Sequence, residues 1–201
     1  MPKLVFFLGP AGSGKTTLAK TLIEKHHAAF FDMDTLARPA AEAIMTLSGL
    51  DPNDRDSPIY KQYCRDLGYR ITMDAALENL HLGIDAFVIG PFTKELEDPL
   101  WLERELSKRE LSTENIEVKA LFIYLLNDSF YRDRIEERGS ALDVWKLENW
   151  SSFSPSLIRR EIKWKLPVTS ILYLDNSEPL TLERQWLIEK FVYGKDGSPN
   201  S

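Results

Sequence analysis

The chain has 201 residues, of which 43% are hydrophobic and 28% are charged. This balance supplies apolar side chains for one buried core, which excludes a disordered chain and a coiled coil. The 25 Lys and Arg residues against 31 Asp and Glu residues give a formal net charge of −6. An acidic chain without a long basic run is not typical of proteins that bind long nucleic acids through the phosphate backbone.

Cysteine content and the first apolar run bear on cellular location. Cys64 is the only cysteine, so the chain forms no internal disulfide, as is typical of proteins in a reducing compartment. The first apolar run, residues 4–8, is far shorter than the roughly 20 residues of a membrane-spanning helix. We therefore expect a cytoplasmic protein with neither signal peptide nor membrane anchor.

Short apolar runs alternate with helical patterns along the chain. The expected strands cover residues 3–8, 30–34, 86–89, 118–126 and 171–174, and the expected helices cover residues 14–26, 38–47, 60–82, 128–138, 156–166 and 181–193. We expect Gly83 to end one helix and Asp128 or Ser129 to cap the next. Apolar strands separated by helices predict an α/β fold, a parallel sheet covered on both faces. We expect a single domain over residues 1–193 and a flexible tail over 194–201.

The most specific motif follows the first expected strand and reads Gly9-Pro10-Ala11-Gly12-Ser13-Gly14-Lys15-Thr16. It matches G-x-x-x-x-G-K-[ST], the Walker A phosphate-binding loop (P-loop), in the strand-loop-helix context that the motif requires. Glycines let backbone N–H groups turn toward phosphate, Lys15 is placed to contact the β- and γ-phosphates, and Thr16 is placed to bind Mg²⁺. The sequence predicts an ATP and magnesium site with nucleotide contacts from Gly9, Ala11, Gly12, Ser13, Gly14, Lys15, Thr16 and Thr17.

Two acidic residues lie at the end of the second expected strand, whereas the third strand runs directly into Gly90 without an acid. Asp32 and Asp34 are two residues apart, so on an extended chain both would point to the same side, into the crevice beside the P-loop. We expect Asp34 to orient the acceptor hydroxyl as a base, and Asp32 to be a partner in the magnesium shell. The alternative is that the pair ends a strand in solvent and caps the following helix.

Arginines mark the helix expected over residues 128–138. Arg134 and Arg138 are four residues apart and share a helix face that leads into Gly139 and Ser140. Arginines on a closing lid supply positive charge to a phosphoryl group in transfer, so we assign both a catalytic role and Arg134 a nucleotide contact. The alternative is an exposed helix whose arginines, Arg132 included, form ion pairs with Asp133, Glu136 and Glu137.

Four features occur in order: the P-loop, Asp32-x-Asp34, Gly90-Pro91-Phe92, and Arg134-x-x-x-Arg138 followed by residues 139–146. Together they resemble the P-loop small-molecule kinases, which include shikimate and gluconate kinases, chloramphenicol phosphotransferase and the kinase domain of polynucleotide kinase. Residues 138–146 also resemble the R-G-x-x-x-D-x-W-K lid element of bacterial ATP-binding kinase-like proteins. The resemblance spans residues 1–177, nearly the whole domain.

This resemblance implies a five-stranded parallel sheet in the order 2-3-1-4-5 and ATP as the phosphate donor. It also implies a lid over residues 130–155 and a loop, Asp175-Asn176-Ser177, whose backbone lies against adenine, so Asn176 is an expected ATP contact. In such kinases the acceptor is held by helices between strands two and three, here residues 35–82.

Within that stretch, polar residues that are able to face the crevice are Arg38, Arg65 and Tyr69. An arginine there would clamp an anionic or hydroxyl-rich acceptor, and the residues just past strand three, Phe92, Thr93 and Lys94, would form the opposite wall. The same spacing also suits the solvated edge of an ordinary helix.

We expect an ATP-dependent kinase that phosphorylates a hydroxyl group of a small molecule. A kinase for a nucleoside, a nucleotide or a nucleic-acid 5′-end is an alternative, because the acidic charge argues against a long polymer but not against a terminal nucleotide. A nucleotide-dependent switch or ATPase that acts on a protein partner is a further alternative, and it predicts an exposed apolar patch.

Overall fold

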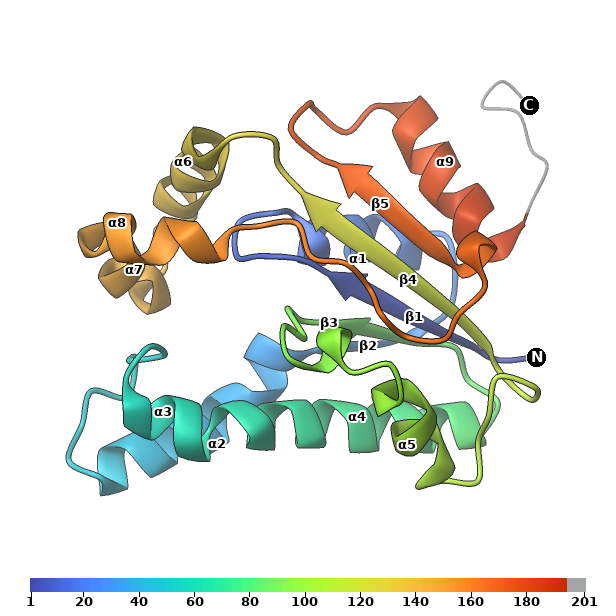
Figure 1. Ribbon diagram of the computed structural model, residues 1–201, viewed down its shortest axis with the longest axis horizontal. Helices are drawn as coiled ribbons and strands as arrows, with labels where there is room; N and C mark the ends of the chain where they lie inside the picture. The colour runs from blue at the N-terminus through green and yellow to red at the C-terminus, as the bar shows by residue number, and fades with distance from the viewer. Residues whose placement is uncertain (195–201) are drawn as a thin grey trace.

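The computed structural model describes residues 1–194, and its centre is one five-stranded sheet (Figure 1). The strands are β1 (Lys3–Leu8), β2 (Ala29–Asp32), β3 (Ala86–Ile89), β4 (Glu117–Tyr124) and β5 (Ile171–Asp175). All neighbouring strands pair in parallel, in the order β2-β3-β1-β4-β5. The predicted fold class and strand order are confirmed. Residues 195–201 of the predicted tail lie outside the described part of the chain.

The helices alternate with these strands along the chain. They are α1 (Lys15–Ile23), α2 (Met33–Leu47), α3 (Pro58–Tyr63), α4 (Arg65–His81), α5 (Trp101–Ser107), α6 (Asp128–Arg138), α7 (Val144–Glu148), α8 (Trp150–Phe153) and α9 (Leu182–Tyr193). Single 3-10 turns form η1 (Glu95–Glu97), η2 (Ala141–Asp143), η3 (Ser154–Ser156) and η4 (Val168–Ser170). Across residues 1–194, every helix is too short or too polar to cross a bilayer.

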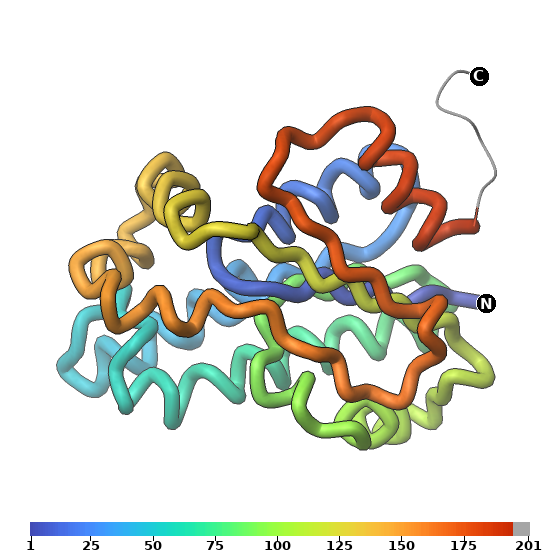
Figure 2. Tube along the Cα trace, turned by 45° about the horizontal axis from the view of Figure 1, so that its top comes forward, coloured from blue at the N-terminus to red at the C-terminus, as the bar shows by residue number. Residues whose placement is uncertain are grey.

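Alternating side chains of β1 build one core on each face of the sheet. Leu4, Phe6 and Leu8 pack into the core that α4 and α5 cover. Val5 and Phe7 pack into the core that α1 and α9 cover. Figures 1 and 2 show α1 and α9 on one side of the sheet and α4 and α5 on the other. Because both faces are covered, most residues of the strands are apolar, and the charged ones lie at or near strand ends.

The predicted long helix over residues 60–82 is wrong, because two helices, α3 and α4, meet at Cys64. The backbone φ of −105° at Cys64 departs from helical geometry and separates them. The Ser57 hydroxyl caps α3 by accepting a hydrogen bond from the Tyr60 N–H at 3.2 Å, so α3 begins earlier than expected. Gly83, with a φ of 81°, follows the end of α4 as predicted.

Two further helices differ from expectation at their first residues. The N-cap of α6 is Asn127, not Asp128 or Ser129. α2 begins at Met33 rather than at residue 38 and continues through Pro39. Consequently, Asp34 does not lie on an extended chain but in the first turn of a helix.

The predicted helix over residues 156–166 is also wrong, because residues 157–166 form an extended strap that leads from the lid to β5. Two of its N–H groups donate to distant partners and not to carbonyls of a preceding helical turn. Ile162 N–H donates to the Tyr173 hydroxyl at 2.8 Å, and Lys163 N–H donates to the Leu96 carbonyl at 3.0 Å. The Trp164 ring stacks on that of Trp101, with ring centroids 5.3 Å apart. From Glu161 onward, charged and apolar residues alternate, which is the strand-like period that the helical interpretation overlooked.

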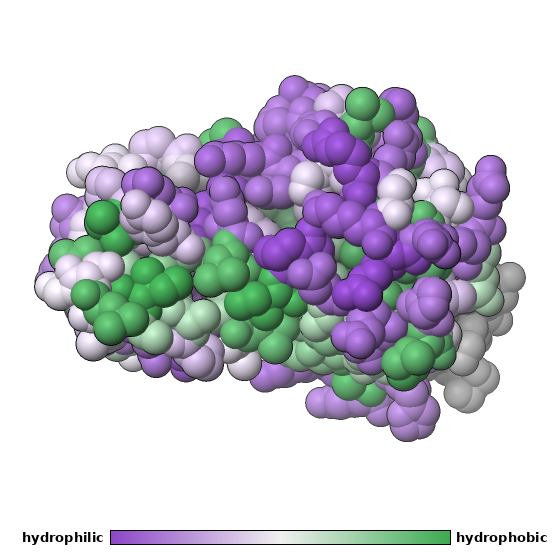
Figure 3. All heavy atoms as spheres, turned by 90° about the horizontal axis from the view of Figure 1, so that it is seen from below, coloured by the Kyte–Doolittle hydropathy of each residue, from purple (hydrophilic) through white to green (hydrophobic). Residues whose placement is uncertain are grey.

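The segment between β2 and β3 exposes apolar side chains. Figure 3, a view from below, shows hydrophobic residues gathered on the half of the molecule that carries α2, α3 and the start of α4, while the other half is mostly hydrophilic. The exposed large apolar residues of this segment are Leu47, Leu50, Tyr63 and Leu67 in its first part, and Leu82 and Ile84 just before β3. This is the kind of surface that the switch alternative predicts.

Burial of Trp164 in the strap gives a testable prediction. Its ring is 3% exposed, so we expect Trp164→Ala to lower the free energy of unfolding by about 3–5 kcal/mol through lost packing and a cavity. Trp145→Ala is the matched control, because its ring is 41% exposed and we expect a change of at most about 1 kcal/mol. Urea unfolding followed by far-UV circular dichroism measures both variants. Equal effects of the two substitutions would contradict this description of the strap.

Candidate active site

The P-loop lies between β1 and α1, in the predicted place. Gly9 has a φ of 133° and Gly14 a φ of 95°, a region in which side chains other than hydrogen are strained. A Cβ atom on Gly9 would overlap the backbone carbonyl of Ile123 in β4. Gly14 is the N-cap of α1, so the first N–H groups of that helix have no carbonyl partner within it. The loop therefore presents backbone donors and the positive end of a helix to an anion.

The amine of Lys15 lies back over this loop. Its Nζ donates a hydrogen bond to the Pro10 carbonyl oxygen at 2.7 Å. Burial lowers the pKa of Lys15 to about 8, while the carboxylates of Asp34 and Asp32 oppose that change, Asp34 more strongly. The amine of Lys15, at the start of α1, therefore lies near the carboxylates of Asp32 at the end of β2 and Asp34 at the start of α2.

Thr16 and Asp32 are in direct contact. Thr16 Oγ1 donates a hydrogen bond to Asp32 Oδ2 at 2.8 Å, and Asp32 is buried. Hydroxyl and carboxylate oxygens are ligands that Mg²⁺ accepts together with phosphate oxygens and water. The pair fits a magnesium ion beside the P-loop.

Asp32 also caps α2. Its Oδ1 accepts a hydrogen bond from the Asp34 N–H at 3.0 Å, so the capping interpretation holds together with the Thr16 contact. The extended geometry expected to align Asp34 with Asp32 is wrong, because Asp34 lies within α2. Its carboxylate is exposed, and among residues 1–194 it makes no side-chain hydrogen bond. The Asp34 carboxylate is therefore unpaired in the first turn of α2.

β3 ends without an acid. Gly90 follows Ile89, and a Cβ atom on Gly90 would lie 2.9 Å from the ring of Phe92. Phe92 has a φ of 44°, which is strained for a residue with a side chain, and its ring is fully buried. Apolar packing fills the end of β3, so the acids of the site come from the end of β2.

Arg134 and Asn176 lie over the start of α1. Arg134 Nη2 donates to the Asn176 carbonyl at 2.7 Å, and Asn176 Nδ2 donates to the Ser13 carbonyl at 2.9 Å. A Cβ atom on Gly14 would overlap the Asn176 amide and lie 3.6 Å from Arg134 Nη1. The loop after β5 and helix α6 are thus tied to the P-loop, while Thr17 remains exposed at the start of α1.

Arg138, Asp143 and Lys146 form an ion-pair cluster in the lid. Asp143 is 1% exposed; its Oδ2 accepts from Arg138 Nε at 2.8 Å, and its Oδ1 accepts from Lys146 Nζ at 2.7 Å. Both cations help to lower the pKa of Lys15. The sequence interpretation named Arg138 but assigned no role to Asp143 or Lys146, although the lid element contains both. Arg132 differs, since its Nε pairs with Glu136 at 2.8 Å along α6, as the exposed-helix alternative describes.

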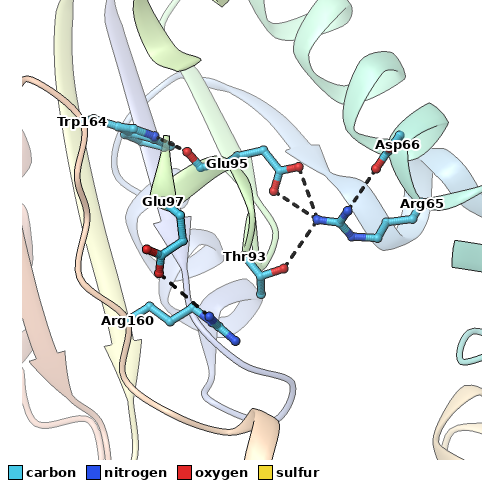
Figure 4. Close-up of polar contacts among 7 residues, drawn as sticks. All are labelled: Arg65, Asp66, Thr93, Glu95, Glu97, Arg160 and Trp164. Carbon is cyan, nitrogen blue, oxygen red and sulfur yellow. Dashed lines mark hydrogen bonds and ion pairs between the residues drawn. The ribbon is translucent and has the colours of Figure 1, made fainter. Parts of the chain in front are cut away.

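Arg65 forms part of the expected acceptor wall (Figure 4). Figure 4 shows its guanidinium reaching from α4 to the chain after β3. Nη2 donates to Glu95 Oε2 at 3.2 Å and to Thr93 Oγ1 at 3.5 Å, and Nη1 donates to Asp66 at 3.0 Å. Because carboxylates already pair with this guanidinium, it offers little free charge to an anionic acceptor.

Tyr69 and Arg38 differ in their accessibility. Tyr69 is 6% exposed, and its ring packs in the core against that of Phe92, with centroids 4.6 Å apart. The guanidinium of Arg65 lies over the Tyr69 ring at 5.0 Å, so the predicted direct contact with an acceptor is wrong and Tyr69 supports Arg65 instead. Arg38 is exposed one turn after Asp34 on α2.

Asp56 and Tyr60 carry shifted pKa values that the sequence interpretation did not foresee. Burial raises the pKa of Asp56, whereas Lys146 of the lid and Lys61 oppose that change. Burial raises the pKa of Tyr60 to about 12, with Asp34 contributing in the same direction. The turn before α3 therefore lies near both the lid and the start of α2, a proximity that no local sequence pattern reveals.

The pKa of Lys15 predicts a pH dependence. Above about pH 8 the amine loses its proton, and the phosphates of ATP restore it, so binding takes up a proton and apparent affinity falls by up to about tenfold per pH unit. Calorimetry at about pH 9, in buffers of different ionisation enthalpy, measures this uptake. Lys15→Met is the control that removes it. ATP binding at this pH without proton uptake would contradict the assignment.

Solved kinase structures are similar to this chain in fold, although their sequence identity to it is low. No protein-family model and no curated protein sequence matches it. A solved kinase candidate from Chloroflexus aurantiacus is similar, with 15% identity, 94% of this chain and 97% of that chain covered, and a TM-score of 0.67. A sugar kinase from Janibacter sp. has 19% identity, coverage of 94% and 91%, and a TM-score of 0.59. A gluconokinase from Sinorhizobium meliloti has 16% identity, coverage of 96% and 90%, and a TM-score of 0.52. The chain therefore has the fold of the P-loop small-molecule kinases.

Proposed function

We propose that this protein transfers the γ-phosphoryl group of ATP to a hydroxyl group of a small molecule, with Mg²⁺ as the cofactor. The observation that carries the proposal is the meeting of Lys15, Asp34 and the Thr16–Asp32 pair at the carboxyl edge of the sheet. A P-loop alone supports nucleotide binding, whereas an unpaired carboxylate beside it supports activation of an acceptor. A cytosolic location is part of the proposal, since Cys64 is a free thiol.

In the proposed reaction, the acceptor oxygen forms a bond to the γ-phosphorus while the bond from that phosphorus to the β–γ bridging oxygen breaks and ADP leaves. Asp34 takes the proton of the acceptor hydroxyl and orients its oxygen in line with the phosphorus. Lys15 contacts the β- and γ-phosphates from the loop side. Magnesium, when bound, neutralises charge on the phosphate oxygens, and Thr16 and Asp32 are the residues that would hold it.

The lid and the helices between β2 and β3 complete the proposed site. Arg134 and Arg138 would supply positive charge to the phosphates from the side opposite Lys15, within a lid over residues 130–155. The acceptor would lie against residues 35–82, with Asp34 and Arg38 as its contacts from α2 and Arg65 in its wall. A neutral, hydroxyl-rich acceptor fits this wall, because Glu95 and Asp66 already balance the charge of Arg65.

Asp34 gives the test of this proposal. We expect magnesium-dependent ATP consumption that rises with one class of acceptor in a panel of sugars, nucleosides, aminoglycosides and short 5′-hydroxyl oligonucleotides. Asp34→Asn should lower kcat by about 100- to 10,000-fold, the contribution of a positioned general base. Its affinity for ATP should stay close to that of the wild type, as measured by calorimetry.

Two controls accompany the assay. Lys15→Ala should abolish the consumption, and Glu114→Gln should leave it unchanged, because Glu114 is exposed in the turn before β4, at the edge of the sheet opposite the P-loop. ATP turnover that no acceptor stimulates and that Asp34→Asn does not change would overturn the kinase proposal. That outcome would favour a switch acting on a protein partner, for which the exposed Leu47, Leu50 and Leu67 offer a surface.

A further inference from the structure

Lys146 belongs to a tightly held group in the lid. Its side chain is 15% exposed, and its Nζ donates to Asp143 Oδ1 at 2.7 Å and to the Leu142 carbonyl at 3.3 Å. The other carboxylate oxygen of Asp143 accepts from Arg138. One buried carboxylate thus fixes two cations, and the triplet keeps a net positive charge.

α6 brings this triplet toward the P-loop. A Cβ atom on Gly12 would lie 3.1 Å from Ile135 Cγ1 and 3.3 Å from the Tyr131 carbonyl, so α6 rests directly on the loop. Arg138 follows Ile135 by about one turn, at the end of α6, and Asp143 follows the turn through Gly139. Figure 1 shows α6 and α7 at the same end of the sheet as the P-loop.

The triplet contributes little to folding stability by itself. Burial of the Asp143 and Lys146 charges costs free energy that largely offsets their attraction, and solvent screens the pair with Arg138, whose side chain is 46% exposed. The cluster is therefore weak evidence for stabilisation. A bound triphosphate, in contrast, carries more negative charge than Lys15 alone balances, and oriented cations stabilise it without reorganisation. The arrangement therefore fits a role in orienting positive charge toward a bound triphosphate better than a role in stabilising the fold.

On the basis of the kinase function proposed above, we infer that Lys146 is a second lid cation that contacts the terminal phosphate of ATP. Asp143 is a positioning residue that holds Lys146 and Arg138 toward the P-loop. Lys146 therefore distinguishes ATP from ADP, because only ATP carries the phosphate that it contacts.

The chain contains a matched control for this triplet. Glu105 of α5 has a side chain that is 9% exposed; its Oε2 accepts from Arg70 Nη1 at 2.6 Å, and its Oε1 accepts from Lys108 Nζ at 2.7 Å. The Glu105 cluster thus also joins one carboxylate, one arginine and one lysine. It lies between α4 and α5, whereas the Asp143 cluster lies in the lid at the other side of the molecule (Figure 1).

The test measures the affinities for ATP and ADP by calorimetry, with magnesium and without any acceptor. Lys146→Met should lower the ratio of ATP affinity to ADP affinity by about tenfold, the size expected for one hydrogen bond between charged groups. Asp143→Asn should lower the ratio in the same direction, since both cations lose their anchor. Lys108→Met and Glu105→Gln should leave it unchanged. Thermal unfolding of all four variants separates loss of fold from loss of discrimination.

The outcomes separate this inference from the proposed function. If Lys146→Met keeps the wild-type ratio while Lys15→Ala abolishes ATP binding, the inference is overturned and the proposed function stands. If the ratio falls in Lys146→Met but no acceptor is phosphorylated, the lid contact is supported and the proposed transfer is overturned. If Asp143→Asn does not fold, Lys146→Met decides the result. An equal fall in Lys108→Met would also overturn the inference, because the effect would then not depend on the lid.

Discussion

The hydrogen bond between Thr16 and Asp32 is the contact on which the arrangement of the site depends. It joins the first turn of α1, which follows β1, to the end of β2, and it forms because β1 and β2, although separated by β3, end at one edge of the sheet. The same carboxylate caps α2, which sets the start of that helix and places Asp34 beside Lys15. One buried acid therefore connects the phosphate loop to the segment proposed to bind the acceptor. The end of β3 contributes no acid, because Phe92 fills that place.

Burial and neighbouring charges together set the pKa of Lys15 at the centre of this site. Burial favours the neutral form of Lys15, and the carboxylates of Asp32 and Asp34 favour its charged form, so its pKa lies near 8. The lid adds cations, but Asp143 offsets part of their charge and fixes their positions. Such a site is oriented before substrates arrive, and this orientation is what phosphoryl transfer requires of a protein.

The strap links the lid to the wall of the proposed acceptor site. It follows the last turn of the lid and crosses the sheet face where a helix was expected. Trp164 Nε1 donates to the Glu95 carbonyl at 2.8 Å, while the Glu95 carboxylate pairs with Arg65 (Figure 4). Arg160 and Lys163 of the strap also pair with Glu97. The chain after β3 is therefore held by α4 on one side and by the strap on the other.

The sequence by itself determined the strands, the P-loop and the fold class, because strand hydrophobicity and the loop's glycines follow local rules. It also indicated that Asp32, at the end of strand two, and Arg138, on the helix after strand four, lie near Lys15 of the P-loop. Tertiary structure decided the rest. Tyr69 has the spacing of a crevice residue, yet the neighbouring Phe92 ring draws it into the core. Residues 157–166 became a strap because partners distant in sequence, Leu96 and Tyr173, take up its N–H groups. Lys146 is held by the buried Asp143, and α6 packs on the P-loop; such packing between distant segments leaves no local sequence pattern.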